Sequence, residues 1–226
     1  MNSNTIVTIE GNIGCGKSTI LNCIKEYNSN ANVPIILVKE PVDEWENIKD
    51  AAGKSILQLF YENPHEYAFS FQMMAYISRL NNLKKAIMEN TNSIIVTERS
   101  LLTDKFVFAK MLKDDNKIKD VDYAIYLNWF DTFSQDFPVH KVIFMNSTPT
   151  TCYDRISRRS RTGESNITFD YLKNCHKYHD KMMENYCKML NTENIYIFNA
   201  EYDNLQSNSN HIEEFYKMMK FILNNA

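Results

Sequence analysis

The chain has 226 residues, 44% of them apolar and 23% charged, and a formal net charge of −3. These values predict one domain with an α/β core over residues 1–226 and exclude a bulk nucleic-acid binder. No apolar run approaches the length of a bilayer span, and Met1–Thr5 lacks signal-peptide character. We therefore expect a cytoplasmic protein with neither membrane nor nucleic acid as partner. Five cysteines without a C-x-x-C pair favour reduced thiols.

The first predicted strand, Thr5–Ile9, leads into a glycine-rich loop and then a helical stretch. Residues 11–19 read GNIGCGKST and fit the phosphate-loop pattern G-x-x-x-x-G-K-[ST]. Its glycines let backbone N–H groups, the helix N-terminus and Lys17 face phosphate oxygens, while Ser18 can hold a Mg²⁺. The order strand, loop, helix predicts a protein that uses a nucleoside triphosphate. The predicted phosphate-binding residues are Gly11, Asn12, Ile13, Gly14, Cys15, Gly16, Lys17, Ser18 and Thr19.

Strand-like and helix-like segments alternate along the rest of the chain, which predicts a parallel sheet of five strands covered by helices on both faces. The predicted strands are Thr5–Ile9, Ile35–Lys39, Ser93–Thr97, Lys141–Met145 and Asn194–Phe198. Helix signals, among them Asn-Pro, Thr-Pro and Thr starts, predict helices at about 64–89, 120–133, from Pro149, at about 169–189 and at 211–223. A polar loop is expected at 201–210.

Charged residues stand where this fold places ligands. Glu40 follows the second predicted strand and Glu98 the third, at the carboxyl edge of the sheet, where we favour function over helix capping. Arginines at 155, 158, 159 and 161 end the helix that starts at Pro149. Beside a phosphate loop, they predict a lid, at about 155–165, whose guanidinium groups pair with phosphate oxygens. Cys175, His176 and His179 invite a zinc interpretation, but a second ligand pair is missing, so we expect helix packing and assign no metal there.

These features together resemble the deoxyribonucleoside kinase family over about 5–190. The segments that carry the resemblance are 11–19, EPVDEW at 40–45, YENP at 61–64, Phe71-Gln72, Glu98-Arg99-Ser100 and 155–164. The family implies a P-loop kinase fold that moves the γ-phosphoryl group of ATP, or another nucleoside triphosphate, to the 5′-hydroxyl of a deoxynucleoside in nucleotide salvage. It also implies Mg²⁺ as a cofactor. The family further implies a homodimer that forms through the helices at 63–89 and 120–133. The apolar residues that these two helices carry are Phe69, Met73, Tyr76, Ile77, Tyr123, Tyr126, Leu127 and Phe130.

The resemblance assigns roles around the transferred phosphoryl group. Glu40 would accept the 5′-hydroxyl proton, and Arg99 would hold the 5′-oxygen in line with Glu40. Glu98 would bind Mg²⁺ together with Ser18. The 3′-hydroxyl would contact Tyr61 and Glu164. Transition-state charge would be stabilised by Lys17, Arg155, Arg159 and Arg161, which leaves Arg158 on the surface.

The base would be read by side chains on two helices. Gln72 can pair with the polar edge of a cytosine or a purine, and Phe71 and Phe108 would sandwich the ring. Arg79 and Asp104 resemble the pair found in deoxycytidine, deoxyguanosine and deoxyadenosine kinases, while thymidine-accepting mitochondrial and insect members lack that pair. We therefore expect dC, dA or dG to be favoured over thymidine. Trp45 either lines this pocket or packs beneath it.

Three other classes of protein compete with this interpretation. A nucleoside monophosphate kinase has a similar loop and lid, but no basic pair beyond Arg79 and Arg99 is placed to hold an acceptor phosphate. A GTPase is disfavoured because Asp50–Gly53, which mimics D-x-x-G, lies in a predicted helical stretch and no N-K-x-D follows. A non-catalytic interaction subunit is expected to lose Lys17, Glu40 or Glu98, and all three are present.

Overall fold

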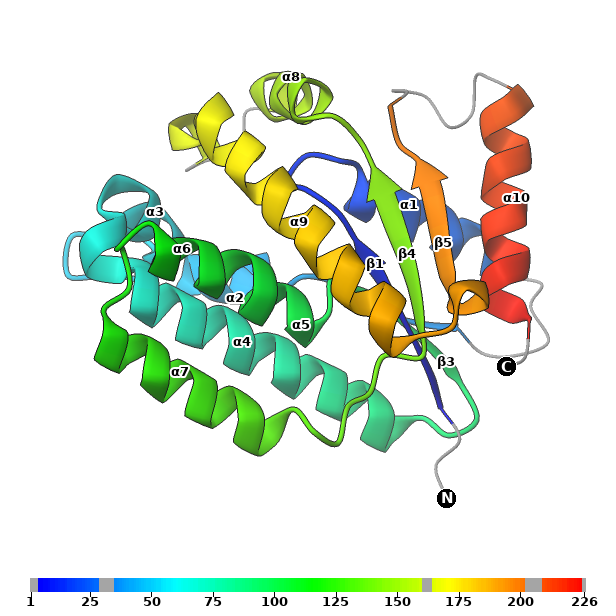
Figure 1. Ribbon diagram of the computed structural model, residues 1–226, viewed down its shortest axis with the longest axis horizontal. Helices are drawn as coiled ribbons and strands as arrows, with labels where there is room; N and C mark the ends of the chain where they lie inside the picture. Colours follow the sequence, from blue (N-terminus) through cyan, green and yellow to red (C-terminus); the bar gives the residue numbers. More distant parts are fainter. Residues whose placement is uncertain (1–3, 29–34, 160–163, 202–208, 225–226) are drawn as a thin grey trace.

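The computed structural model describes residues 4–28, 35–159, 164–201 and 209–224 (Figure 1). A five-stranded sheet lies at its centre, in the order β2-β3-β1-β4-β5, and every pair of neighbouring strands is parallel. The predicted α/β fold is therefore confirmed, with strand ends displaced by one residue from the predicted ones. The strands are β1 Thr5–Glu10, β2 Ile35–Val38, β3 Ile94–Glu98, β4 Lys141–Asn146 and β5 Ile195–Asn199.

Helices connect the strands and cover the sheet. They are α1 Lys17–Tyr27, α2 Val42–Asn47, α3 Ile56–Glu62, α4 Pro64–Glu89, α5 Leu101–Thr103, α6 Lys110–Asp114, α7 Asp120–Phe133, α8 Pro149–Arg159, α9 Phe169–Met189 and α10 Ser209–Leu223. A π-helical segment, Asp104–Ala109, joins α5 to α6. The start of α9 after Thr168 is confirmed, and the Thr168 hydroxyl caps the helix by accepting from the Tyr171 N–H at 3.1 Å. The predicted cap at Asn63 is wrong, because its side chain makes no capping hydrogen bond to the first turn of α4 and donates to the Glu66 carboxylate instead.

Different helices cover the two faces of the sheet. Successive side chains along a strand point to opposite faces, so each face packs against its own set of helices. On one face, Val7, Ile9 and Ile94 pack with apolar residues of α1, α8 and α10. On the other, Ile6 and Ile95 pack under α4 and α7, and the β4 end of that face lies under α9, which crosses the sheet diagonally (Figure 1). Both faces being covered explains why the strands are mostly apolar.

In the order β2-β3-β1-β4-β5, the connections after β1 and β3 cross to opposite sides of the sheet. The loops that follow β1 and its neighbours therefore diverge and leave room at the carboxyl edge of the sheet. The phosphate loop follows β1, and Glu98 ends β3. The topology therefore brings the phosphate loop and Glu98 together at the carboxyl edge of the sheet. No helix within the described residues is long and apolar enough to cross a membrane.

One further local expectation is wrong. Asp50–Gly53 is a turn rather than part of a helix: Lys49 and Ser55 form an antiparallel bridge around it, and the Asp50 carboxylate accepts from the N–H groups of Ala52 and Lys54. Gly53, with φ 83°, takes the left-handed conformation that ends this turn.

Of the eight apolar residues on α4 and α7 expected to support a homodimer, three belong to the core. Tyr76, Tyr126 and Phe130 are buried between α4, α7 and the sheet. What α7 exposes is a different stripe, spaced four residues apart along the helix. Its members, with their exposed fractions, are Val121 70%, Ile125 42%, Trp129 46% and Phe133 46%, joined on α4 by Ile77 at 45%.

Candidate active site

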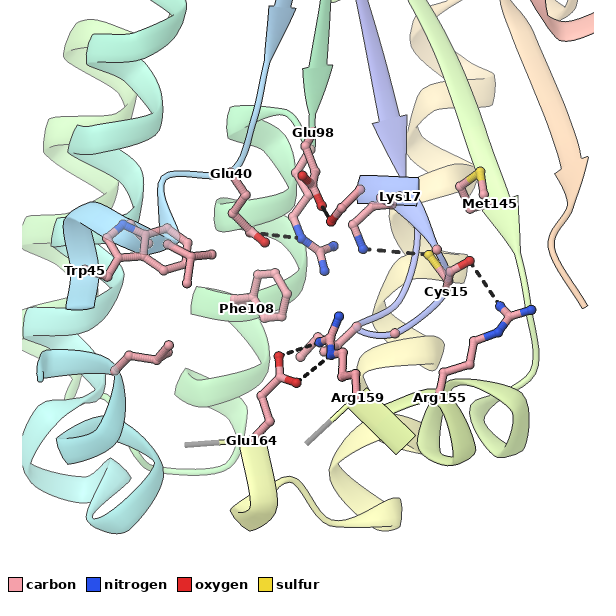
Figure 2. Close-up of a pocket in the computed structure, with 18 of the residues that line it drawn as sticks. Cys15, Lys17, Glu40, Trp45, Glu98, Phe108, Met145, Arg155, Arg159 and Glu164 are labelled. Carbon is pink, nitrogen blue, oxygen red and sulfur yellow. Dashed lines mark hydrogen bonds and ion pairs between the residues drawn. The ribbon is translucent and has the colours of Figure 1, made fainter. Parts of the chain in front are cut away.

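A cavity of about 810 Å³ opens at the carboxyl edge of the sheet (Figure 2). Nearly all predicted site residues among the described ones line it, from the phosphate loop at one end to α4 and the π-helical segment at the other. The predicted residues on its wall are Ile13, Gly14, Cys15, Gly16, Lys17, Ser18, Thr19, Glu40, Trp45, Tyr61, Phe71, Gln72, Arg79, Glu98, Arg99, Asp104, Phe108, Arg155, Arg159 and Glu164. Gly11 and Asn12 lie behind it, and Arg161 is outside the described residues.

The phosphate loop wraps around Lys17. Its Nζ donates to the carbonyls of Gly11 at 3.2 Å and Asn12 at 2.7 Å, and is 3.7 Å from the Cys15 sulfur. Gly14, with φ 81°, passes so close to α8 that a Cβ would lie 2.6 Å from the Cys152 carbonyl oxygen. Any side chain at 14 would displace the loop or the helix. The loop thus keeps a charged amine at the centre of a ring of backbone, as an anion site needs.

Ser18 and Glu98 meet beside this loop. The Ser18 hydroxyl donates to the Glu98 carboxylate at 2.7 Å, although 80 residues separate them in the chain. Both offer oxygen ligands, the type that Mg²⁺ prefers, and such sites complete the ion's shell with water and substrate phosphates. The residues present therefore fit the predicted Mg²⁺ site.

Glu40 lies between two guanidinium groups. Its Oε1 accepts from Arg79 NH2 at 3.0 Å and is 3.3 Å from Arg99 Nε. Burial alone would raise the pKa of Glu40, but the charges of Arg99, Arg79 and Lys17 outweigh it and lower its pKa to about 2. The carboxylate is therefore ionised at neutral pH and can accept a hydrogen bond from a substrate hydroxyl.

Arg79 and Asp104 form the expected pair, deep in the cavity wall. Arg79 Nε donates to Asp104 Oδ2 at 2.9 Å, and both side chains are at most 5% exposed. Arg79 also donates to the Glu98 carbonyl at 2.8 Å. Together with Glu40, the guanidinium therefore contacts three acidic residues, two through their carboxylates and Glu98 through its backbone carbonyl. Burial raises the pKa of Asp104 despite this pairing.

Gln72 and an aromatic group form the far end of the cavity. Gln72 is 2% exposed, and its buried Oε1 has no hydrogen-bond partner among the described residues. An unpaired buried amide oxygen is costly, so its place on the cavity wall suits a ligand that donates to it. Phe71 stacks on Phe60 at 4.7 Å and meets Trp45 edge-on at 5.3 Å. Trp45 does both things expected of it, since it lines the cavity and donates to Ser78 at 2.9 Å.

The lid side of the cavity carries a second ion pair. Glu164 accepts from Arg159 Nε at 2.6 Å and from Arg159 NH2 (Figure 2). Burial raises the pKa of Tyr61, and the charge of Glu164 raises it further. Tyr61 and Glu164 therefore lie close enough on the cavity wall to interact. Arg155 turns toward the base of the phosphate loop and donates to the carbonyls of Cys15 at 3.3 Å and Ala200 at 2.8 Å. Arg158 is exposed, as expected, although it also touches the cavity rim.

The cavity wall includes residues that the sequence interpretation missed. Phe60, Met145 and Tyr171 line it, as do Phe198 in β5 and Ala200, which follows the end of that strand. Met145 and Phe198 stand at the carboxyl ends of their strands, a position that marks ligand contact once the sheet order is known. His179, considered only for zinc, is wholly buried and lies 3.2 Å from Arg99 NH1.

Comparison with known proteins agrees with this geometry. The family model described as deoxynucleoside kinase matches residues 7–224. The chain is 30% identical over 197 residues to human deoxycytidine kinase, which covers 78% of this chain and 74% of that protein. It is 32% identical over 180 residues to the probable deoxycytidine kinase of fowlpox virus, covering 78% and 71%. The mitochondrial deoxyguanosine kinase of Xenopus laevis is 26% identical over 207 residues, covering 84% and 77%.

Proposed function

Because the chain belongs to the deoxynucleoside kinase family, whose members are phosphoryl-transferring enzymes of nucleotide salvage, we propose that it phosphorylates the 5′-hydroxyl of deoxycytidine, deoxyadenosine or deoxyguanosine. One observation carries this proposal: a single cavity joins a phosphate loop, an ionised Glu40 and an unpaired Gln72 amide oxygen. A phosphoryl donor, a hydroxyl to be deprotonated and a polar base edge each find a partner there.

The donor triphosphate would occupy the phosphate loop. Lys17, now bonded to loop carbonyls, would turn to the β- and γ-phosphates, and Ser18 with Glu98 would hold Mg²⁺. Mg²⁺ held there would supply neutralisation of the phosphate charge that develops during transfer. Arg159 and Arg161 would add positive charge from the lid. Arg155, which braces the loop from behind, would act on the phosphates only after leaving Cys15 and Ala200.

The acceptor hydroxyl would lie between Glu40 and Arg99. Since Glu40 has a pKa of about 2 in the free protein, it is a weak base, and the hydroxyl proton would move to it only as the oxygen bonds to phosphorus and its acidity rises. Arg99 would hold the 5′-oxygen in line. Tyr61 and Glu164 would contact the 3′-hydroxyl, which joins substrate binding to the lid through the pair of Glu164 with Arg159.

The base would lie between Phe71 and Phe108, with its polar edge on Gln72. Arg79 and Asp104 would stand beside the base, where a thymine methyl group would press on a fully paired guanidinium. These contacts favour dC, dA and dG over thymidine. They also disfavour a nucleotide acceptor, because Arg79 and Arg99 are both engaged by carboxylates and neither is positioned for an acceptor phosphate.

An assay with ATP and Mg²⁺ tests this function, with each deoxynucleoside and each deoxynucleoside monophosphate as acceptor. We expect phosphorylation of one or more of dC, dA and dG, little of thymidine and none of the monophosphates. The Lys17→Met variant is the matched control, since it keeps the cavity and removes the only amine inside the loop among the described residues. Activity on monophosphates alone would support a nucleoside monophosphate kinase, and no activity with any acceptor would support a non-catalytic subunit.

We also propose that two copies associate through α4 and α7. The exposed stripe Val121, Ile125, Trp129 and Phe133 runs the length of α7, and a continuous apolar helix face of this kind suits a two-fold helical contact. Light scattering at micromolar concentration should show twice the 26.5 kDa of one chain. Trp129→Glu should give the monomer, whereas Tyr216→Glu, at a side chain 49% exposed on α10, which covers the other face of the sheet, should leave the dimer intact. A 26.5 kDa species for the unmodified protein would contradict the proposal.

A further inference from the structure

The side chain of Arg99 is enclosed on several sides. It is 2% exposed, and its NH1 donates to the Gly11 carbonyl at 2.6 Å. The Phe108 ring lies under the guanidinium, 5.0 Å from its carbon, and Glu40 lies 3.3 Å from Nε. The pair with Glu40 does not have hydrogen-bond alignment, because the buried Nε has no hydrogen-bond partner within the part of the chain that the structure describes. Charge attraction to Glu40 therefore does not fix the orientation of the Arg99 guanidinium. Its other contacts do.

His179 provides one of these contacts. Its Nδ1 is 2.8 Å from the Cys175 carbonyl oxygen, and a carbonyl only accepts, so Nδ1 carries the proton. Nε2 of the neutral ring is then an acceptor, and it lies 3.2 Å from Arg99 NH1, which can only donate. The two bonds fix a single tautomer. Burial, with the charge of Arg99, lowers the pKa of His179 well below its usual value, in agreement with a neutral ring.

The backbone fixes the other end of the same arginine. Arg99 has a φ of 68°, a left-handed conformation that is rare outside glycine, and its N–H donates to the Ile9 carbonyl at 3.0 Å. The next N–H, of Ser100, donates to the buried carboxylate of Glu10 at 2.9 Å. The backbone thus sets where the side chain starts, while Gly11 and His179 set where it ends.

We propose that His179 is a positioning residue of the phosphoryl transfer: its Nε2 lone pair holds the Arg99 guanidinium in the plane that faces Glu40 and the acceptor 5′-oxygen. The inference rests on the roles proposed above for Arg99 and Glu40. His179 itself touches neither substrate nor metal, since it lies behind Arg99 and is absent from the cavity wall. Helix α9 thereby contributes to catalysis through His179, a buried residue that lies among apolar neighbours and that packing alone would have explained.

The contrast between two substitutions separates positioning from packing. His179→Leu keeps the buried volume and removes the acceptor, whereas His179→Gln places an amide oxygen close to where Nε2 stands. We expect His179→Leu to lower kcat about 10- to 100-fold, the range for losing a hydrogen bond to a charged group. The KM for ATP should change little, because the phosphate loop is untouched. His179→Gln should return kcat to within about fivefold of the unmodified protein.

Met182→Ala is the matched control for loosening of α9. Met182 is 1% exposed on the same helix, and packs with Val107 and Val142 rather than with Arg99. We expect it to lower the urea midpoint of unfolding with kcat almost unchanged. If Met182→Ala lowers kcat as much as His179→Leu does, the effect is packing and the proposal is wrong.

A double-mutant cycle with Arg99→Lys decides whether His179 acts through Arg99. In the Arg99→Lys background, His179→Leu should lower kcat by less than about twofold, since the group that it positions is gone. Equal losses in both backgrounds would overturn the inference, as would a kcat for His179→Leu equal to that of the unmodified protein. If Arg99→Lys itself leaves kcat unchanged, the proposed role of Arg99 fails instead, and the two failures are thereby distinguished.

Discussion

The buried pair of Arg79 and Asp104 offers the sharpest test of substrate choice. The perturbation is a cycle of Arg79→Met, Asp104→Ala and the double variant. Arg79 has three acceptors, namely Asp104 at 2.9 Å, the Glu98 carbonyl at 2.8 Å and Glu40 at 3.0 Å. Removing one member of the pair and removing both therefore have different consequences.

The cost in folding stability follows from which charge remains buried. Breaking a buried pair by removing one partner typically costs about 3 to 5 kcal/mol. Asp104→Ala should cost about 3 kcal/mol, near the lower limit, because Glu40 and the Glu98 carbonyl still compensate Arg79. Arg79→Met leaves Asp104 without the cation that donates a hydrogen bond to it. Its pKa, already raised by burial, would rise further until the carboxyl takes up a proton, which limits the loss.

The double variant removes both charges and leaves a smaller, apolar wall. We expect its free energy of unfolding to lie within about 2 kcal/mol of the unmodified protein, with a coupling between the two sites of at least about 2 kcal/mol. Space for the thymine methyl should raise kcat/KM for thymidine relative to the best natural substrate by about 10- to 100-fold. Activity on that natural substrate should fall, partly because Glu40 loses one of its two guanidinium neighbours.

Two measurements complete the test: kcat/KM for thymidine and for the best of dC, dA and dG, and urea unfolding of all four proteins in the cycle. The ratio of the two kcat/KM values is the informative quantity, since damage to Glu40 lowers both alike. If the unmodified protein already prefers thymidine, or if the ratio does not change in the double variant, Arg79 and Asp104 are not the specificity element. Gln72 and the aromatic residues would then carry the choice.

The other predictions concern single side chains. Glu40→Gln should lower kcat by about 10²- to 10⁴-fold with little change in nucleoside binding by calorimetry, and a near-normal kcat would remove Glu40 from the mechanism. Lys17→Met should abolish turnover, so residual activity above a few per cent in the coupled assay would contradict the proposed loop function. His179 is neutral in the folded protein but takes up a proton near pH 6.5 when unfolded, so below that pH acid favours the unfolded state. His179→Gln should therefore remove up to about 1.4 kcal/mol per pH unit from the loss of stability between about pH 6.5 and 5, measured by urea unfolding, and an unchanged slope would contradict a neutral, buried His179.

The sequence by itself was sufficient for the features that depend on neighbouring residues. Glycine spacing and Lys17 defined the phosphate loop, β-branched runs defined the strands, and the start of α4 at Pro64 and its end at Glu89 followed from local signals. Position after a predicted strand identified Glu40 and Glu98, and the resemblance to a family added Gln72 and Arg79; the structure brings all four to one cavity. Such patterns can be read locally because hydrogen bonds and side-chain packing within one element act over a few residues.

Only the tertiary structure decided which groups share a charge or a hydrogen bond across the fold. Arg79 reaches Glu40 across 39 residues, and Arg99 reaches His179 across 80. Burial on α7 was also a tertiary outcome, since Tyr126 packs inward while Trp129 faces out on the same apolar helix. Periodicity shows that a helix has an apolar face, but which side is covered depends on the neighbour that packs there. Likewise, the pKa of a carboxyl or an imidazole is set by charges brought close in space, and those charges come from strands and helices far apart in the chain.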